Sequence, residues 1–321
     1  MIRFEKAAKV YPDGTRAVQS MDLEIKKGEF FVFIGPSGCG KTTTMKMINR
    51  LIDPSDGKVF IQDKNVQEYE IHELRWNIGY VLQQIALFPH MTIEENIAIV
   101  PELKKWTPDQ INKRVDELLD MVGLEPETYR SRKPSELSGG QQQRIGVVRA
   151  LAADPDIILM DEPFSALDPI SREKLQTDIA DLQKRIKKTI VFVTHDMQEA
   201  LALGDRIAIM KDGQVIQADT PQKLIEQPAN DFVREFIGSR AVPEQKVRQA
   251  KVGDLHASFQ PAPEEFPHPP ISYYAPVIEA VEQLRGKQAL SVEKDGTIIG
   301  IVTPEIVMEY LAEKLGMEGV R

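Results

Sequence analysis

Two segments of this 321-residue chain have the residue types and spacing to bind phosphate groups. The first fits the pattern G-x-x-x-x-G-K-T and runs from Gly35 to Thr42. With the threonine that follows, its residues are Gly35, Pro36, Ser37, Gly38, Cys39, Gly40, Lys41, Thr42 and Thr43. Glycine lets backbone N–H groups turn inward without a Cβ clash, and a helix after the loop adds its positive N-terminal end. Lys41 supplies a charge for the β- and γ-phosphates, and the Thr42 hydroxyl is a ligand for Mg²⁺. The segment therefore predicts a site for ATP and Mg²⁺.

The second segment begins at Leu137 and reads L-S-G-G-Q. Ser138 stands at the predicted start of a helix that runs to about residue 152. A second cradle for an anion would be formed by the Ser138 hydroxyl and the N–H groups of Gly139 and Gly140. Gln141 follows directly and is counted with this site. The chain is therefore predicted to carry two such cradles.

Acidic and imidazole groups follow two predicted strands. The apolar run from Ile157 to Met160 leads into Asp161 and Glu162, and the β-branched run from Thr189 to Thr194 leads into His195. On residue types alone, exposed acids at a strand end and a surface histidine are the alternatives to catalytic roles.

Cys39 is the only cysteine, which excludes an intrachain disulfide and fits a reducing cytosol. A cysteine near Lys41 and a helix N-terminus could be a low-pKa nucleophile. The favoured interpretation is a small residue at a variable position of the loop.

Hydrophobic periodicity predicts the elements that position these groups. An apolar run ending at Ile34 enters the loop, and a helix follows with Met45, Ile48 and Leu51 on one face. Other expected elements are a helix capped by Thr107 and Gln110, a helix with Leu175, Ile179, Leu182 and Ile186 on one face, and strands at Arg206–Met210 and Gln214–Ala218. Strands that alternate with helices predict an α/β class with a mostly parallel sheet. Turns at Asp13-Gly14 and Lys27-Gly28 predict an antiparallel accessory sheet.

The composition limits which binding partners and which kinds of segment are expected. A formal net charge of −9 argues against nucleic acid, because no basic excess offsets phosphate repulsion. No apolar run approaches the roughly 18 to 20 residues of a membrane helix. The first residues, Met1 to Lys6, contain no apolar signal core.

The two glycine motifs and the Asp161-Glu162 strand together resemble the ABC-type ATPases, over residues 1 to about 238. The resemblance implies a P-loop cassette with a RecA-like parallel sheet core, an antiparallel β subdomain and an α-helical signature subdomain. It implies that Asp161 is the Walker B carboxylate that holds Mg²⁺, that Glu162 is the general base, and that His195 contacts the γ-phosphate.

The same resemblance assigns further residues. Gln83 would contact Mg²⁺ and the attacking water, with Gln84 as the alternative, and Tyr11 would stack on adenine, with an edge-strand core tyrosine as the alternative. Asp168, in the segment S-A-L-D that begins at Ser165, would lie in a loop at a dimer seam. The Ser138 segment of a second copy would close over the γ-phosphate, so the resemblance implies a dimer.

The stretch from Gln83 to Ile97 resembles importer ATPases, in which a groove here receives a coupling helix. Leu87, Phe88 and Pro89 would line that groove, or would be ordinary core residues.

The stretch from Asn96 to Leu103 resembles the ATPase subunits of quaternary-amine importers, which take up glycine betaine, choline, carnitine or proline betaine. The expected partners are a second copy, membrane permease subunits and, indirectly, a solute-binding protein, at the cytoplasmic face of the membrane. The alternatives are import of another solute, such as a polyamine, amino acid or sugar, and a soluble ATPase with a regulatory tail.

Residues 239–321 are predicted to form a linker and a small α+β module. A proline-rich stretch from Gln260 to Pro270 precedes an expected helix near Val277, a hairpin and a final helix. The module resembles a single CBS motif. In that family an acidic residue contacts the ribose of the bound nucleotide. In this chain its position is occupied by Ile306, and the nearest acid, Glu305, lies one residue earlier. A dimerising or stabilising role is therefore favoured over nucleotide binding.

Overall fold

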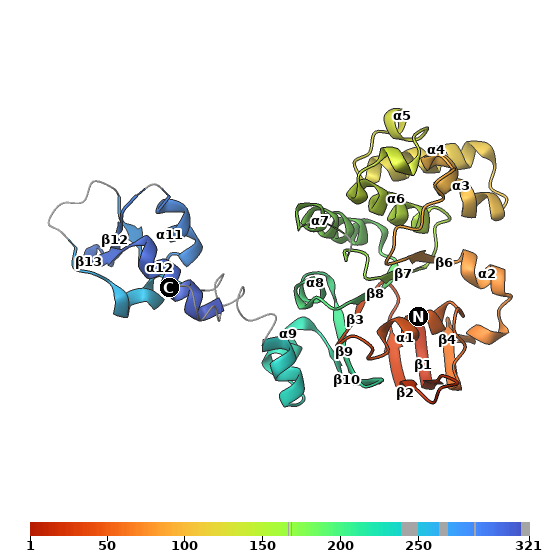
Figure 1. Ribbon diagram of the computed structural model, residues 1–321, viewed down its shortest axis with the longest axis horizontal. Coiled ribbons are helices and arrows are strands. Elements are labelled where there is room, and N and C mark those ends of the chain that lie inside the picture. Colours follow the sequence, from red (N-terminus) through yellow and green to blue (C-terminus); the bar gives the residue numbers. More distant parts are fainter. Residues whose placement is uncertain (166, 168, 239–249, 263–268, 286, 316–321) are drawn as a thin grey trace. The chain divides into compact units, whose positions relative to one another are not determined.

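The computed structural model describes residues 1–165, 167, 169–238, 250–262, 269–285 and 287–315. The chain divides into two compact units, Met1–Arg234 and Glu235–Arg321, and each has a hydrophobic core of its own (Figure 1).

A six-stranded sheet forms the centre of the first unit (Figure 1). Five of its strands are parallel and the sixth joins one edge antiparallel, which confirms the predicted α/β class. In order across the sheet, the strands are β10 (Gln214–Asp219), β9 (Arg206–Lys211), β3 (Phe30–Ile34), β8 (Thr189–Thr194), β7 (Ile157–Asp161) and β6 (Ile78–Val81).

An antiparallel sheet packs beside the central sheet. Its strands are, in order, β2 (Arg16–Ile25), β1 (Ile2–Val10), β4 (Asp56–Ile61) and β5 (Lys64–Asn65). The Asp13-Gly14 turn joins β1 to β2 as predicted. The prediction for Lys27-Gly28 is wrong, because that turn leads from β2 into β3 of the central sheet. All five residues of β3 are buried, and such an apolar run belongs in a sheet that is covered on both faces.

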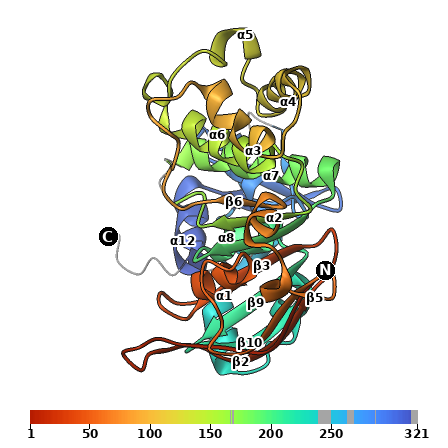
Figure 2. The same cartoon turned by 90° about the vertical axis from the view of Figure 1, so that its right-hand side faces the viewer.

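Helices cover the central sheet, and one group of them forms a separate layer (Figure 2). The helices of the first unit are α1 (Lys41–Ile48), α2 (Ile71–Trp76), α3 (Ile93–Leu103), α4 (Pro108–Met121), α5 (Pro126–Tyr129), α6 (Gly139–Leu151), α7 (Pro169–Ile186), α8 (Met197–Leu203) and α9 (Pro221–Glu226), with 3₁₀ turns at Val66–Glu68 and Pro134–Glu136. A further helical stretch, residues 231–238, crosses the boundary between the two units. Helices α3 to α6 form the layer apart, whereas α1 lies between the two sheets and contacts β8, β2 and β4.

Side-chain caps define where several helices begin. Thr107 and Gln110 form the predicted capping box at α4, and Ser138 and Gln141 form one at α6. Each box satisfies backbone N–H groups that have no partner within the helix. The start of α6, with Gly139 at its first turn, is therefore fixed by local sequence.

Helix α1 is shorter than its apolar spacing predicts. It ends at Ile48, and Arg50 has a left-handed φ of 51° that breaks the helical path. Leu51 consequently leaves the core-facing stripe and is 47% exposed.

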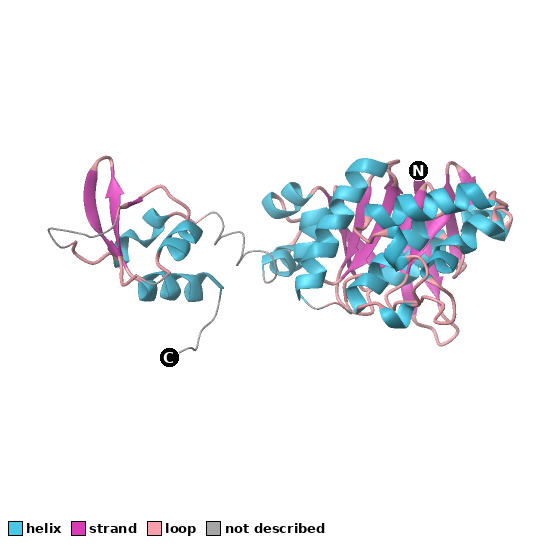
Figure 3. Cartoon of the chain, turned by 90° about the horizontal axis from the view of Figure 1, so that it is seen from above, coloured by secondary structure: helices cyan, strands magenta, loops and turns pink. Residues whose placement is uncertain are grey.

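The second unit is a small α+β module, which can be followed in Figure 3. A three-stranded sheet has the order β11 (Ile271–Ser272), β12 (Leu290–Lys294) and β13 (Thr297–Val302), and β12 and β13 form the predicted hairpin. A 3₁₀ segment at Val252–Ser258 and the helices α11 (Val277–Gln283) and α12 (Pro304–Leu315) complete it.

Candidate active site

The phosphate loop joins the end of β3 to the start of α1. Gly40 has a φ of 100°, and a Cβ added there would lie 2.1 Å from the carbonyl oxygen of Ala17. A Cβ on Gly35 would lie 2.2 Å from the carbonyl oxygen of Met210. Both positions therefore require glycine for close backbone packing.

A pocket of about 330 Å³ opens at this loop. Its lining residues are Tyr11, Thr15, Ala17, Ser37, Gly38, Gly40, Lys41, Thr42, Thr43 and Glu162. Within the loop, the Lys41 ammonium donates to the carbonyl oxygens of Gly35 at 2.8 Å and Pro36 at 3.0 Å. Tyr11 lies at the other side, with its hydroxyl 3.4 Å from that of Thr43. The predicted loop residues and Tyr11 thus surround one cavity, although Gly35, Pro36 and Cys39 do not line it.

The Cys39 side chain packs into the hydrophobic core behind the loop. Burial raises the pKa of its thiol above the usual value, against an opposing effect of the Lys41 charge. A reactive cysteine needs the thiolate, so this environment favours the structural interpretation.

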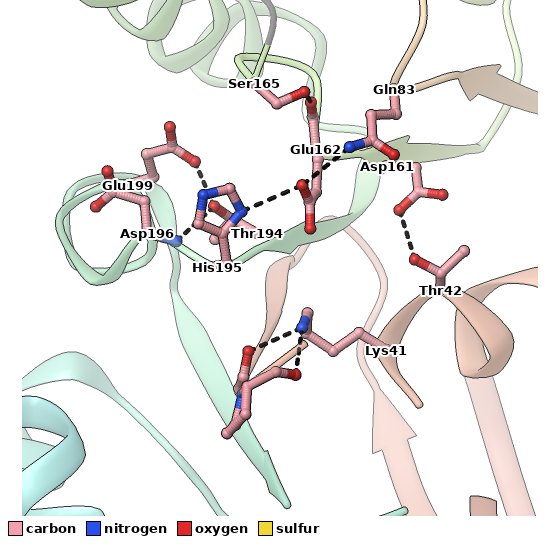
Figure 4. Close-up of polar contacts among 12 residues, drawn as sticks. Lys41, Thr42, Gln83, Asp161, Glu162, Ser165, Thr194, His195, Asp196 and Glu199 are labelled. Atoms are coloured by element: carbon pink, nitrogen blue, oxygen red, sulfur yellow. Dashed lines mark hydrogen bonds and ion pairs between the residues drawn. The ribbon is translucent and has the colours of Figure 1, made fainter. Parts of the chain in front are cut away.

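Thr42 and Asp161 meet across the start of α1 and the end of β7. The Thr42 hydroxyl donates to Oδ1 of Asp161 at 2.8 Å (Figure 4). Asp161 is buried, and burial raises the pKa of its carboxyl although the Thr42 hydrogen bond opposes that shift. Within the described part of the chain, no three His, Cys, Asp or Glu residues cluster as a metal cage. Mg²⁺ at nucleotides takes one or two carboxylates together with phosphates and water, so a hydroxyl–carboxylate pair fits it.

Glu162 lies at the centre of the polar groups above the phosphate loop (Figure 4). Its Oε2 accepts from the Gln83 amide at 3.2 Å and lies 3.1 Å from Nδ1 of His195. Glu162 has a left-handed φ of 44°, and its N–H donates to the carbonyl oxygen of Val193. Three predicted residues from separate strand ends therefore converge, and the contact favours Gln83 over Gln84.

Two further residues beneath His195 were not predicted. The Thr194 hydroxyl donates to Glu199 and accepts from the N–H of Asp196 at 3.0 Å. Glu199 is only 5% exposed, and burial raises the pKa of its carboxyl. This chain of hydrogen bonds fixes the turn that carries His195. A glutamate near the start of a short helix resembles a surface residue, so the sequence contained no signal for its burial.

The Ser138 segment lies outside the phosphate pocket. The Ser138 hydroxyl accepts from the N–H of Gln141 at 3.3 Å and thereby caps α6, while Ser138 and Gly139 are exposed. Asp168 and Ala166 of the predicted seam loop lie outside the described residues, but Ser165 donates to the carbonyl oxygen of Glu162 at 3.0 Å.

An apolar groove of about 470 Å³ lies beside β6. Its lining residues are Arg75, Trp76, Ile78, Gly79, Tyr80, Leu82, Ala86, Phe88, Ile99, Val100, Arg149, Ala150 and Ala153. Phe88 is therefore placed as predicted, whereas Pro89 does not line the groove and Leu87 is buried elsewhere. Asn96, which is fully buried, fixes this segment: its side chain accepts from the N–H of Phe88 and donates to the carbonyl oxygens of Phe88 and Thr92.

Comparisons with known proteins identify the family of the chain. The ABC transporter family matches residues 18–165. A dimeric ATP-binding cassette in a post-hydrolysis state, bound to ADP and Pi, is 37% identical with a TM-score of 0.62 and covers 69% of this chain and 99% of that one.

Two relatives come from Bacillus subtilis (strain 168). The glycine betaine/carnitine/choline transport ATP-binding protein OpuCA is 60% identical over 238 residues, which is 74% of this chain and 62% of OpuCA. The choline transport ATP-binding protein OpuBA is 50% identical over 310 residues, which is 96% of this chain and 79% of OpuBA. The chain thus spans less than two thirds of the length of OpuCA. It belongs to the ATP-binding proteins of the ABC transporter family.

Proposed function

We propose that this chain hydrolyses ATP as one half of a two-copy assembly, and that it powers import of a quaternary-amine osmoprotectant. The observation that carries the ATPase assignment is the convergence of Gln83 and His195 on Glu162, next to the Thr42–Asp161 pair and above Lys41.

Each residue has a role that follows from its position. Lys41 binds the β- and γ-phosphates after exchanging its loop carbonyls for phosphate oxygens. Bound Mg²⁺, held by Thr42 and Asp161, would neutralise charge on those phosphates. Glu162 accepts a proton from the attacking water, while Gln83 and His195 orient the Glu162 carboxylate and contact the water and γ-phosphate.

The second copy completes the site. Ser138 and Gly139 are exposed, Gly140 is partly exposed, and all three lie outside the chain's own pocket, so they are free to close over the nucleotide of a partner. The dimeric state of the similar ADP-bound cassette supports this arrangement. Asp168 is proposed to lie at the same seam.

The import function rests on relatives and on the groove. Relatives named for glycine betaine, carnitine and choline transport share 50–60% identity with the chain. No described helix is long and apolar enough to cross a membrane. The groove beside β6 is proposed to receive a coupling helix of a membrane permease. In this proposal the chain lies at the cytoplasmic face of the membrane and is linked indirectly to a solute-binding protein.

Growth and purification together test this function. Cells that lack the chain should lose growth rescue by glycine betaine, choline or carnitine at high osmolarity, and the tagged chain should co-purify with a multi-spanning permease. Rescue by polyamines or sugars instead would indicate another solute, and co-purification with DNA or ribosomes would contradict a transport role.

The second unit is proposed to be a CBS-like module that acts as a dimer contact. Ile306 is buried in the module core, and the neighbouring Glu305 is exposed, with its pKa lowered by a hydrogen bond from Thr303. An apolar side chain at the expected ribose position supplies no acceptor. Calorimetry on full-length Lys41→Ala chain, in which the cassette site is weakened, should show no tight binding of an adenosine nucleotide. Tight stoichiometric binding would contradict the proposal.

A further inference from the structure

The hydroxyl of Tyr80 is an unusual buried group in the first unit. Tyr80 lies on β6, and its ring packs against the hydrophobic core. The hydroxyl is shielded from solvent, and no hydrogen bond of ordinary geometry joins it to a partner in the described part of the chain, although it interacts with the side chain of Asp161. Buried tyrosine hydroxyls ordinarily find a partner, since leaving one unpaired is costly. The incomplete contact with Asp161 therefore points to a second state in which this hydrogen bond is fully formed.

The strand register identifies the nearest suitable acceptor. Strands β6 and β7 are parallel, and Tyr80 pairs with Leu159. Asp161 lies two residues beyond Leu159 on β7, so it shares the face of the sheet with Tyr80. Diagonal neighbours on one face lie within reach of long side chains. The pKa of Tyr80 is raised, first by burial, then by the Asp161 charge and by a side-chain hydrogen bond with Asp161, which agrees with this placement of the two groups.

Asp161 has the capacity to accept this hydrogen bond. Its Oδ1 accepts from Thr42, and a carboxylate offers about four acceptor positions on its two oxygens. Groups that hydrogen-bond a metal ligand orient it, and such partners affect metal affinity.

We propose that Tyr80 is a positioning residue: its hydroxyl donates to Asp161 when nucleotide and Mg²⁺ are bound, and this holds the carboxylate in the orientation that favours Mg²⁺. The inference rests on the proposed ATP and Mg²⁺ site. In this proposal the segment that contains β6 contacts the site twice. Tyr80 contacts Asp161, and Gln83, three residues further on, contacts Glu162.

A binding measurement separates this role from packing. The test uses Tyr80→Phe in the full chain, with Tyr69→Phe as the matched control, because the Tyr69 hydroxyl donates to the carbonyl oxygen of Ile61 at 2.8 Å, on a different structural element. Binding of a fluorescent ATP analogue is first measured with a metal chelator present. Mg²⁺ is then titrated into the complex of chain and analogue. Tyr80→Phe should bind the Mg²⁺-free analogue like wild type, and should lose about tenfold of the affinity for Mg²⁺. Tyr69→Phe should retain the wild-type affinity for Mg²⁺.

Other results have distinct meanings. If Tyr80→Phe keeps the wild-type Mg²⁺ affinity, the positioning role is wrong. If it loses Mg²⁺-free binding to the same extent, its effect is on the fold and the role is also wrong. If wild type binds no analogue at all, the proposed nucleotide site fails instead. Thermal unfolding of Tyr80→Phe should occur close to the wild-type midpoint, because the substitution removes a buried hydroxyl whose hydrogen bond is not fully formed in the nucleotide-free state.

Discussion

The phosphate loop and the Ser138 segment both place glycines at the start of a helix, yet their surroundings differ. The phosphate loop lines a pocket together with Tyr11 and Glu162, and Lys41 lies buried within it. The Ser138 segment is exposed, and its hydroxyl only caps its own helix. One chain therefore contains a pocket at its phosphate loop and, outside that pocket, a second glycine-containing helix start. This contrast supports the proposal that the two segments serve different nucleotides.

The largest effect is expected at the phosphate pocket, for Glu162→Gln. The substitution keeps the shape of the side chain and removes the proposed general base, so steady-state ATP hydrolysis should fall by about 100- to 10,000-fold while ATP binding remains. A phosphate-release assay with permease present, and an equilibrium binding assay, check the two parts. Turnover near the wild-type rate would remove Glu162 from the role of base.

Lys41→Ala should weaken ATP binding by the chain itself. Loss of a hydrogen-bonded charge costs about 1.5–3 kcal/mol, or roughly a 10- to 150-fold weaker affinity. Titration with a labelled ATP analogue measures it.

Ser138→Arg is the matched variant at the other segment. It should leave binding by the monomer close to the wild-type value, because Ser138 does not line the pocket. Loss of monomer binding as large as that of Lys41→Ala would show that both segments serve one nucleotide.

The smallest effect is expected for Ser138→Ala. Removal of the capping hydroxyl at α6 should lower the free energy of unfolding by about 1 kcal/mol. Chemical denaturation of the nucleotide-free chain measures it. An unchanged free energy would mean that the hydroxyl does not cap the helix in the isolated chain.

Local motifs and periodicity predicted most of the elements and most of the candidate residues. The capping boxes marked the starts of α4 and α6, and apolar strands led directly to Asp161, Glu162 and His195. These signals lie within a few residues of each group, so a single sequence is sufficient to read them.

Features that depend on distant neighbours were not predictable. Arg50, whose left-handed backbone ends α1, donates from its side chain to the carbonyl oxygens of Val66 and Tyr69, and the burial of Leu87 depends on packing between elements. The relation of Tyr80 to Asp161 requires the pairing and register of β6 and β7, and the burial of Glu199 requires the packing beneath β8. Periodicity alone gives the faces of an element and does not give its partners.

Sedimentation velocity on Glu162→Gln chains with ATP and Mg²⁺ tests the two-copy site most directly. Glu162→Gln alone should form a stable dimer, because the bound ATP is not consumed. Glu162→Gln combined with Ser138→Arg should bind ATP and sediment as a monomer, because the partner cradle cannot close. An ATP-dependent dimer of equal stability in the double variant would contradict the account.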